Sequence, residues 1–161
     1  MKKVISIIMG SQSDLEIAGE AINLLKEFKV GFEVKVLSAH RTPRELAEYV
    51  EAAPGRGIKV FIACAGGSAA LAGVVASHTT LPVIGVPIET KSLKGLDSLL
   101  STVQMPAGIP VACMAIGKPG ARNAAIFALE ILGIKDKSIS AKLSAYKKTM
   151  RAKIKKTKIK I

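Results

Sequence analysis

The sequence predicts an α/β protein in which strands and helices alternate along the chain. Short runs rich in Ile and Val, such as residues 4–9, have the unbroken apolar character of strands covered on both faces. Segments with apolar residues at helical spacing, such as 14–28, lie between these runs, and the links are short. We therefore predict a three-layer α/β/α sandwich around a doubly wound parallel five-stranded sheet, with the flavodoxin-like strand order 2-1-3-4-5.

Each element has its own sequence signal. The strands are expected at Val4–Met9, Phe32–Leu37, Lys59–Cys64, Pro82–Val86 and Pro110–Ile116. The first helix has an apolar stripe of Leu15, Ala18, Ala21, Ile22 and Leu25. Pro43 opens the second helix, residues 54–57 end it, and Ser68 caps the third. Further helices are expected at 92–102, at 119–132 before Gly133, and from about Lys135.

Composition bounds the class of protein. The chain has 161 residues, 49% of them hydrophobic, which suits a single domain with a sizeable core. We expect that domain over residues 1–146 and a basic tail over 147–161. No apolar run is long enough to span a membrane, and no signal-peptide pattern follows the N-terminus. Cys64 and Cys113 stand in apolar surroundings, which favours buried, reduced thiols and a cytoplasmic protein.

The net charge of +12 is concentrated at the C-terminal end. Eight basic residues and no acidic one fall in the last fifteen positions, which leaves a net charge of +4 for the rest. They are Lys147, Lys148, Arg151, Lys153, Lys155, Lys156, Lys158 and Lys160. The segment has no aromatic residues between its charges, so nucleic-acid binding is not expected. Its Lys-Ile alternation fits a frayed helix or a solvated tail, and we favour the solvated tail.

Three turns rich in small residues follow the first three predicted strands. They are Gly10-Ser11-Gln12-Ser13-Asp14, Ser38-Ala39-His40-Arg41-Thr42-Pro43 and Ala65-Gly66-Gly67-Ser68. In a doubly wound sheet, ligands bind outside the carboxyl ends of the strands, at the point where the strand order reverses. The three turns are therefore expected to form one crevice for a small anionic substrate.

The residue types in these turns suit acid–base and anion chemistry. His40 can move protons near neutral pH, and Arg41 can grip a carboxylate or phosphate with two parallel hydrogen bonds. The hydroxyls of Ser11 and Ser13, with the free N–H groups of the following helix, can seat an anion. Asp14 either caps that helix, the commoner case, or accepts hydrogen bonds from ribose hydroxyls.

Several other classes of site are disfavoured. The glycine spacing of a dinucleotide fingerprint and the lysine of a P-loop do not occur in the first turn. No cluster has metal-ligand spacing, and no Gly-x-Ser-x-Gly elbow is present. The second histidine, His78, is expected at a helix C-terminus or on the surface.

Six ordered motifs resemble the PurE family of de novo purine biosynthesis, over about residues 4–146. They are Met9-Gly10-Ser11-Gln12-Ser13-Asp14, Ser38-Ala39-His40-Arg41-Thr42-Pro43, Ala65-Gly66-Gly67, Leu81-Pro82-Val83-Ile84-Gly85-Val86-Pro87, Gly95-Leu96-Asp97-Ser98-Leu99 and Val103-Gln104-Met105-Pro106. The resemblance implies a cofactor-free enzyme acting on 5-aminoimidazole ribonucleotide chemistry on the route to IMP. It also implies a homo-octamer, for which the alanine-rich helix over 119–132 offers a packing face.

The resemblance assigns roles to individual residues. It makes His40 the catalytic proton carrier and Arg41 the contact to the substrate phosphate. Ser11 and Asp14 would bind the ribonucleotide, and Gly66 with Gly67 would line the pocket for the carboxylate or CO2. The neighbours that complete the substrate site are Ser13, Ser38, Ala39, Ala65 and Ser68.

The third motif bears on the subclass. Members that move a carboxylate from nitrogen to carbon usually read Gly-Gly-x-Ala-His-Leu-Pro-Gly there, whereas this chain has Ala70 in place of the histidine. Gly67 and Arg41 match these mutases, while Ser68 and Ala70 resemble the direct, CO2-using carboxylases. We favour the mutase. A direct carboxylase and a non-enzymatic nucleotide-binding module are the alternatives.

Overall fold

The structure is a computed structural model that describes residues 1–159. Residues Met1–Ala128 form one compact unit and Leu129–Ile161 a second. Lys160 of the predicted basic tail lies outside the described residues. No helix within residues 1–159 is both long and apolar enough to cross a membrane.

The first unit is built on a five-stranded parallel sheet, as predicted. Its strands pair in the order β2-β1-β3-β4-β5, so the order reverses between β1 and β3. The strands are β1 (Lys3–Met9), β2 (Gly31–Val36), β3 (Val60–Gly66), β4 (Val83–Ile88) and β5 (Ala112–Cys113). Strand β4 runs two residues further than predicted, and β5 is much shorter than the predicted 110–116.

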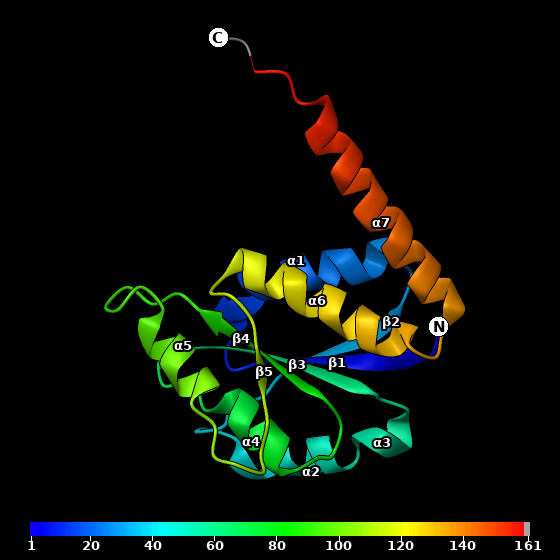
Figure 1. Ribbon diagram of the computed structural model, residues 1–161. Helices are drawn as coiled ribbons and strands as arrows, with labels where there is room; N and C mark the ends of the chain where they lie inside the picture. The colour runs from blue at the N-terminus through cyan, green and yellow to red at the C-terminus, as the bar shows by residue number, and fades with distance from the viewer. Residues whose placement is uncertain (160–161) are drawn as a thin grey trace. The chain divides into compact units, whose positions relative to one another are not determined.

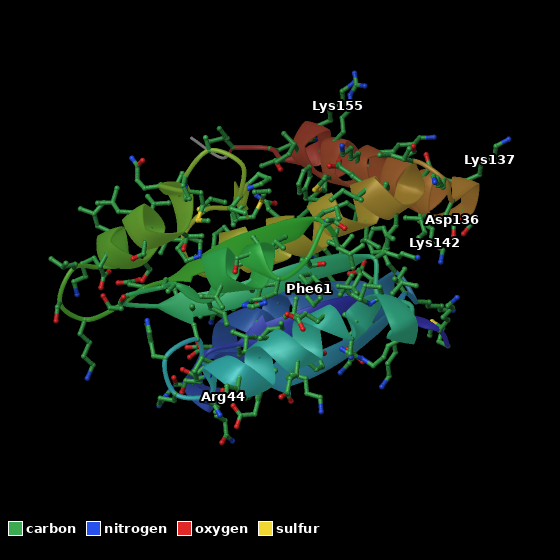
Figure 2. All side chains as sticks on the ribbon, turned by 90° about the horizontal axis from the view of Figure 1, so that it is seen from below. Arg44, Phe61, Asp136, Lys137, Lys142 and Lys155 are labelled. Carbon is green, nitrogen blue, oxygen red and sulfur yellow. The ribbon has the colours of Figure 1, made fainter. Side chains whose placement is uncertain are left out.

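Helices cover both faces of this sheet. Figure 1 shows α1 with α6 on one side and α2, α3 and α4 on the other, which confirms the three-layer arrangement. The helical segments are η1 (Gln12–Asp14), α1 (Leu15–Glu27), α2 (Pro43–Glu51), α3 (Ala53–Arg56), α4 (Leu71–Ser77), α5 (Leu96–Val103) and α6 (Lys118–Gly133). Side chains from the sheet, α2, α3 and α4 form one continuous apolar cluster, with the fully buried Phe61 as its largest member (Figure 2).

Some local predictions were wrong. Leu15 is 46% exposed, because the buried stripe of α1 consists of Ala18, Ala21, Leu24 and Leu25. Residues 53–56 form the extra helix α3 rather than a simple stop, and left-handed Gly57 ends that helix. Ser68 does not cap α4, whose N-cap is Ala70.

A polar network that the sequence did not predict links β1, β2, α2 and α3. The Tyr49 hydroxyl donates to the Glu33 carboxylate and lies 2.8 Å from Ser6 Oγ. The Arg56 guanidinium stacks over the Tyr49 ring and donates to Glu33 Oε1 at 3.1 Å. Burial alone would raise the pKa of Glu33, but hydrogen bonds from Tyr49 and Arg56 and the Arg56 charge hold it below its usual value. Burial, with hydrogen bonding to Glu33, raises the pKa of Tyr49 to about 12.

The predicted packing face of the alanine-rich helix is not available on the surface. Ala121, Ala124, Ala125 and Ala128 of α6 are all fully buried within the chain itself. These alanines therefore give no support to contact with another subunit. Cys64 is a buried free thiol, as predicted, whereas Cys113 is only partly buried.

The second unit contains the helix α7 (Lys137–Lys156). Asp136 caps it by accepting hydrogen bonds from the backbone N–H groups of Ser138 and Ile139. The basic segment is helical as far as residue 156, contrary to the preferred solvated tail, because residues 137–156 contain neither Gly nor Pro. Its side chains are nevertheless exposed through residue 159. Figure 2 labels Lys137, Lys142 and Lys155 along this helix.

Candidate functional site

A cavity of about 610 Å³ opens at the carboxyl ends of the strands, beside the point where the strand order reverses. Its volume lies in the range of small-molecule sites. It is lined by Gly10, Ser11, Ser13, Asp14, Ser38, Ala39, His40, Arg41, Ala65, Gly66, Ser68, Leu71, Ile88, Glu89 and Thr90. The fold thus brings together all the predicted site residues except Gly67, from turns that are far apart in the sequence.

The turn after β1 positions one buried carboxylate at the wall of the cavity. Ser11 is the N-cap of η1, and the Asp14 side chain turns back to accept the Ser11 backbone N–H at Oδ2, at 3.0 Å. The other oxygen, Oδ1, has only a long 3.5 Å contact to the Ser13 hydroxyl. One oxygen of Asp14 therefore builds the turn, and the other retains capacity to accept a hydrogen bond from a ligand.

Burial sets the electrostatics of Asp14. The residue is only 8% exposed. Burial raises the pKa of Asp14, and it outweighs the hydrogen bonds from Ser11 and Ser13 and the nearby charge of Arg41, which act in the opposite direction. The Cys64 thiol is also deeply buried, and this burial, together with the Asp14 charge, raises the pKa of Cys64 to about 12. Cys64 is therefore a packed thiol and not a nucleophile at neutral pH.

The turn after β2 is held together by its own side chains. The Ser38 hydroxyl accepts hydrogen bonds from the backbone N–H groups of His40 and Arg41, at 3.3 and 3.2 Å. The Thr42 hydroxyl accepts the Ser38 N–H at 2.8 Å. These bonds occupy Ser38 and Thr42, and they leave the side chains of His40 and Arg41 exposed beside the cavity.

Arg41 joins the first two turns. Its Nη2 donates to the carbonyl of Gly10 at 3.0 Å, and its Nε lies 3.4 Å from the Ser38 hydroxyl. A guanidinium has five N–H donors, so these two bonds leave further donors for an anionic ligand. The bond to Gly10 fixes the side chain at the cavity before any ligand arrives.

The loop after β3 presents one glycine to the cavity and turns the next one away. Gly66 lines the cavity, whereas Gly67 does not. Gly67 has φ +70°, and its N–H donates to the Ser98 hydroxyl of α5 at 2.9 Å. Its carbonyl lies 3.3 Å from the Ser101 hydroxyl, which donates over a shorter distance to the Asp97 carbonyl within α5. The N–H of Gly67 is thus engaged by α5, behind the wall that Gly66 forms.

The end of β4 adds residues that the sequence analysis missed. Ile88, Glu89 and Thr90 line the cavity because β4 continues through Pro87 to Ile88. The Thr90 hydroxyl donates to the Asp97 carboxylate at 2.9 Å. Glu89 adds a second carboxylate, besides that of Asp14, to the lining of the cavity. Because parallel strands end at one edge of the sheet, the residues after this strand belong at the cavity too, but the strand predicted over Pro82–Val86 stops short of them.

Two further predictions concern residues outside the cavity. His78 ends α4 as its C-cap and pairs with Glu51 at 2.9 Å, as expected for a helix-terminal surface residue. Among the residues that the structure describes, no group of three His, Cys, Asp or Glu side chains is placed to hold a metal ion.

The fold and cavity define a class: a doubly wound α/β protein with a cavity at its switch point whose lining suits a small anionic ligand. Comparison with known proteins narrows this class. Residues 4–153 match the family model described as AIR carboxylase, and the chain belongs to this family. The prediction made from the six motifs is confirmed.

Individual relatives agree with this assignment. The chain is 56% identical over 153 residues to the N5-carboxyaminoimidazole ribonucleotide mutase of Pyrococcus horikoshii, which covers 95% of this chain and 85% of that protein. It is 52% identical to the protein of that name from Saccharolobus solfataricus, over 96% of this chain and 97% of the relative. The crystal structure of Treponema denticola PurE superimposes with a TM-score of 0.85 at 28% identity, over 94% of both chains.

Proposed function

We propose that this protein is an N5-carboxyaminoimidazole ribonucleotide mutase, an isomerase of de novo purine biosynthesis. The observation that carries the proposal is the meeting of His40, Arg41 and Asp14 at one cavity, in a chain of this family. Relatives at 52–59% identity carry the name of this activity. The substrate is a small nucleotide, and its product is 4-carboxy-5-aminoimidazole ribonucleotide.

Different residues of the cavity wall bind different parts of the substrate. Arg41 holds the phosphate, which suits a planar guanidinium already fixed by Gly10. Asp14 accepts a ribose hydroxyl at Oδ1, the oxygen that the turn leaves open. Ser11 and Ser13 complete the nucleotide contacts with their hydroxyls, and Gly66 lines the part of the cavity that receives the carboxylate.

His40 moves the protons of the reaction. Protonation of the carbamate nitrogen by His40 lets the N–C bond break, which releases CO2 and 5-aminoimidazole ribonucleotide. Ring carbon C4 then attacks the retained CO2 to form the new C–C bond, and His40 takes back the proton that C4 loses. One imidazole serves both steps because histidine ordinarily exchanges its proton near neutral pH. The walls hold CO2 close to C4, and this proximity favours recapture over escape.

The remaining features of the proposal follow the family resemblance. The enzyme works without a cofactor, in the cytoplasm, as a homo-octamer. Ala70, where mutases usually carry histidine, does not line the cavity, which supports a mutase that works without that imidazole. The domain over 1–146 carries the activity, and the basic segment over 147–161 takes no part in it.

The competing activity is direct carboxylation of 5-aminoimidazole ribonucleotide, which Ser68 and Ala70 favour. Steady-state assays with the purified protein separate the two. We expect turnover of N5-carboxyaminoimidazole ribonucleotide without ATP, metal or added bicarbonate. Bicarbonate-dependent carboxylation of 5-aminoimidazole ribonucleotide, with no turnover of the N-carboxylated substrate, would overturn the proposal. Absence of both activities would favour a nucleotide-binding module.

A further inference from the structure

Ser98 of α5 sits behind the cavity wall and bonds to two strand ends at once. It is fully buried, unlike most serines, and its hydroxyl has a donor and an acceptor role to fill. It donates to the carbonyl of Ile88 at the end of β4, at 2.6 Å. It accepts the N–H of Gly67, just after β3, at 2.9 Å. A single hydroxyl thus ties the ends of the two strands together.

The two strand ends joined by Ser98 form part of the cavity. Gly66 and Ile88 are the last register pair between β3 and β4, and both line the cavity. Gly67, which Ser98 holds directly, has a left-handed backbone that few other residues adopt readily. The Ser101 hydroxyl, three residues after Ser98, donates to the Asp97 carbonyl of its own helix and lies 3.3 Å from the Gly67 carbonyl. The 66–67 loop is therefore held from behind chiefly through the N–H of Gly67.

The glycine loop has no side chain of its own to fix its position. A chain of two glycines has more conformational freedom than any other dipeptide, so contacts from outside must set its geometry. In the described structure Gly66 is held by its register pair with Ile88 in the sheet, and Gly67, beyond the end of β3, is held by Ser98 of α5. If the 66–67 loop moved, the wall formed by Gly66 would move with it, and a gap of a few tenths of an ångström would change how tightly a small neutral molecule is held.

We propose that Ser98 is a positioning residue that keeps the 66–67 loop closed around released CO2. The proposal rests on the proposed function, because CO2 is the intermediate to be retained. Ser98 touches neither the cavity nor the substrate and takes no part in proton transfer. Its role is to hold Gly66 at the wall, so that CO2 reacts at C4 before it escapes.

The test compares Ser98→Ala with a matched control, Thr102→Val. Thr102 lies one turn further along α5 and is also buried. Its hydroxyl donates to the Ser98 carbonyl within the helix. Valine keeps its shape, including the methyl group that packs near Gly85. Both variants lose one buried hydroxyl from the same helix, but only Ser98→Ala frees the glycine loop. A second variant, Ser98→Cys, keeps a side chain of similar shape but replaces the hydroxyl with a thiol, which is a weak donor and a weak acceptor.

Two measurements are made on the full chain. The amide hydrogen-exchange rate of Gly67 reports on the hydrogen bond from its N–H to Ser98 in the free protein. We expect this rate to rise by roughly 10-fold or more in Ser98→Ala but not in Thr102→Val. Turnover in the presence of ¹³C-bicarbonate reports on retention. We expect Ser98→Ala to lower kcat more than it changes KM, to release free 5-aminoimidazole ribonucleotide, and to incorporate more solvent label into the product. Ser98→Cys should shift both readouts in the same direction, by less.

The outcomes separate the two proposals. Equal label incorporation in the parent, Ser98→Ala and Thr102→Val would overturn the positioning role, as would equal shifts in Ser98→Ala and Thr102→Val. If Ser98→Ala does not fold, unchanged exchange and retention in Ser98→Cys would overturn it instead. A parent protein without turnover of the N-carboxylated substrate would remove both the proposed function and the role in CO2 retention, whatever the Gly67 exchange shows.

Discussion

Replacing Asp14 with Asn should maintain or raise the stability of the free protein and weaken its binding of the nucleotide. The folded protein raises the pKa of Asp14, chiefly by burial, so the folded state binds the proton of this carboxyl more tightly than the unfolded state does. The free energy of unfolding therefore falls as the pH rises from the unfolded value of 3.8 through the raised folded value. At neutral pH the ionised Asp14 destabilises the fold, and a neutral amide of the same shape removes this penalty.

The cost of the substitution appears in ligand binding. In the free protein, Asp14 Oδ2 accepts the Ser11 N–H and Oδ1 remains open. The amide of Asn keeps one acceptor for Ser11, and its NH2 group then replaces the open oxygen with a donor. A hydrogen bond to a charged group contributes about 1.5–3 kcal/mol, so ribonucleotide affinity should fall by about 10- to 150-fold.

The assays are thermal unfolding at pH 7 and calorimetric titration with 5-aminoimidazole ribonucleotide. We expect Asp14→Asn to unfold at the parent's temperature or above it, and to bind the nucleotide more weakly. Asp14→Ala is the control, because it should also weaken binding but leaves the Ser11 N–H without its partner. Parent-like affinity in Asp14→Asn would refute the ribose contact. A clear loss of stability in Asp14→Asn would contradict the destabilisation that we assign to the ionised, buried carboxylate.

Three further predictions use other residues. His40→Asn should lower kcat by roughly 10²–10⁴-fold with nucleotide affinity retained in titration, and near-normal turnover would remove His40 from proton transfer. Arg41→Lys keeps the charge but loses the planar fork, so it should raise the nucleotide Kd, and an unchanged Kd would exclude the phosphate contact. The lowered pKa of Glu33 means that its stabilisation is present above pH 4.5 and is lost as the pH falls through the folded value. Glu33→Gln should therefore lower the free energy of unfolding, measured in urea at pH 7, by about 1–3 kcal/mol. The variant should also lose less stability than the parent as the pH is lowered, and an equal loss in both proteins would contradict this prediction.

The topology and most of the cavity were predictable from the sequence because they depend on short-range signals. Apolar runs and helical spacing located the elements, and the parallel direction of the strands placed the three turns at one edge of the sheet. Residues of those turns, such as Asp14 and Arg41, needed only this placement to be recognised.

The remaining features depend on tertiary contacts that no local pattern encodes. The strand predicted over Pro82–Val86 stops before Pro87, whereas Pro87 lies inside β4, which continues to Ile88 and brings the next residues, Glu89 and Thr90, to the cavity. Nothing in Gly66-Gly67 says which glycine faces the ligand, because Ser98, 31 positions further along, decides it by binding the Gly67 N–H. Likewise, the pairing of Glu33 with Tyr49 and Arg56 emerges only when β2 and α2 are packed together.

The central claim is that the carboxylate migrates within the active site, and the fate of its carbon tests this most directly. A single turnover is run with N5-carboxyaminoimidazole ribonucleotide that carries ¹³C in the carboxylate, in unlabelled bicarbonate, and the product is analysed by mass spectrometry. A mutase that retains CO2 beside C4 predicts 4-carboxy-5-aminoimidazole ribonucleotide with the ¹³C largely preserved. A product whose carboxyl carbon comes from the solvent, or no product from this substrate, would contradict the account.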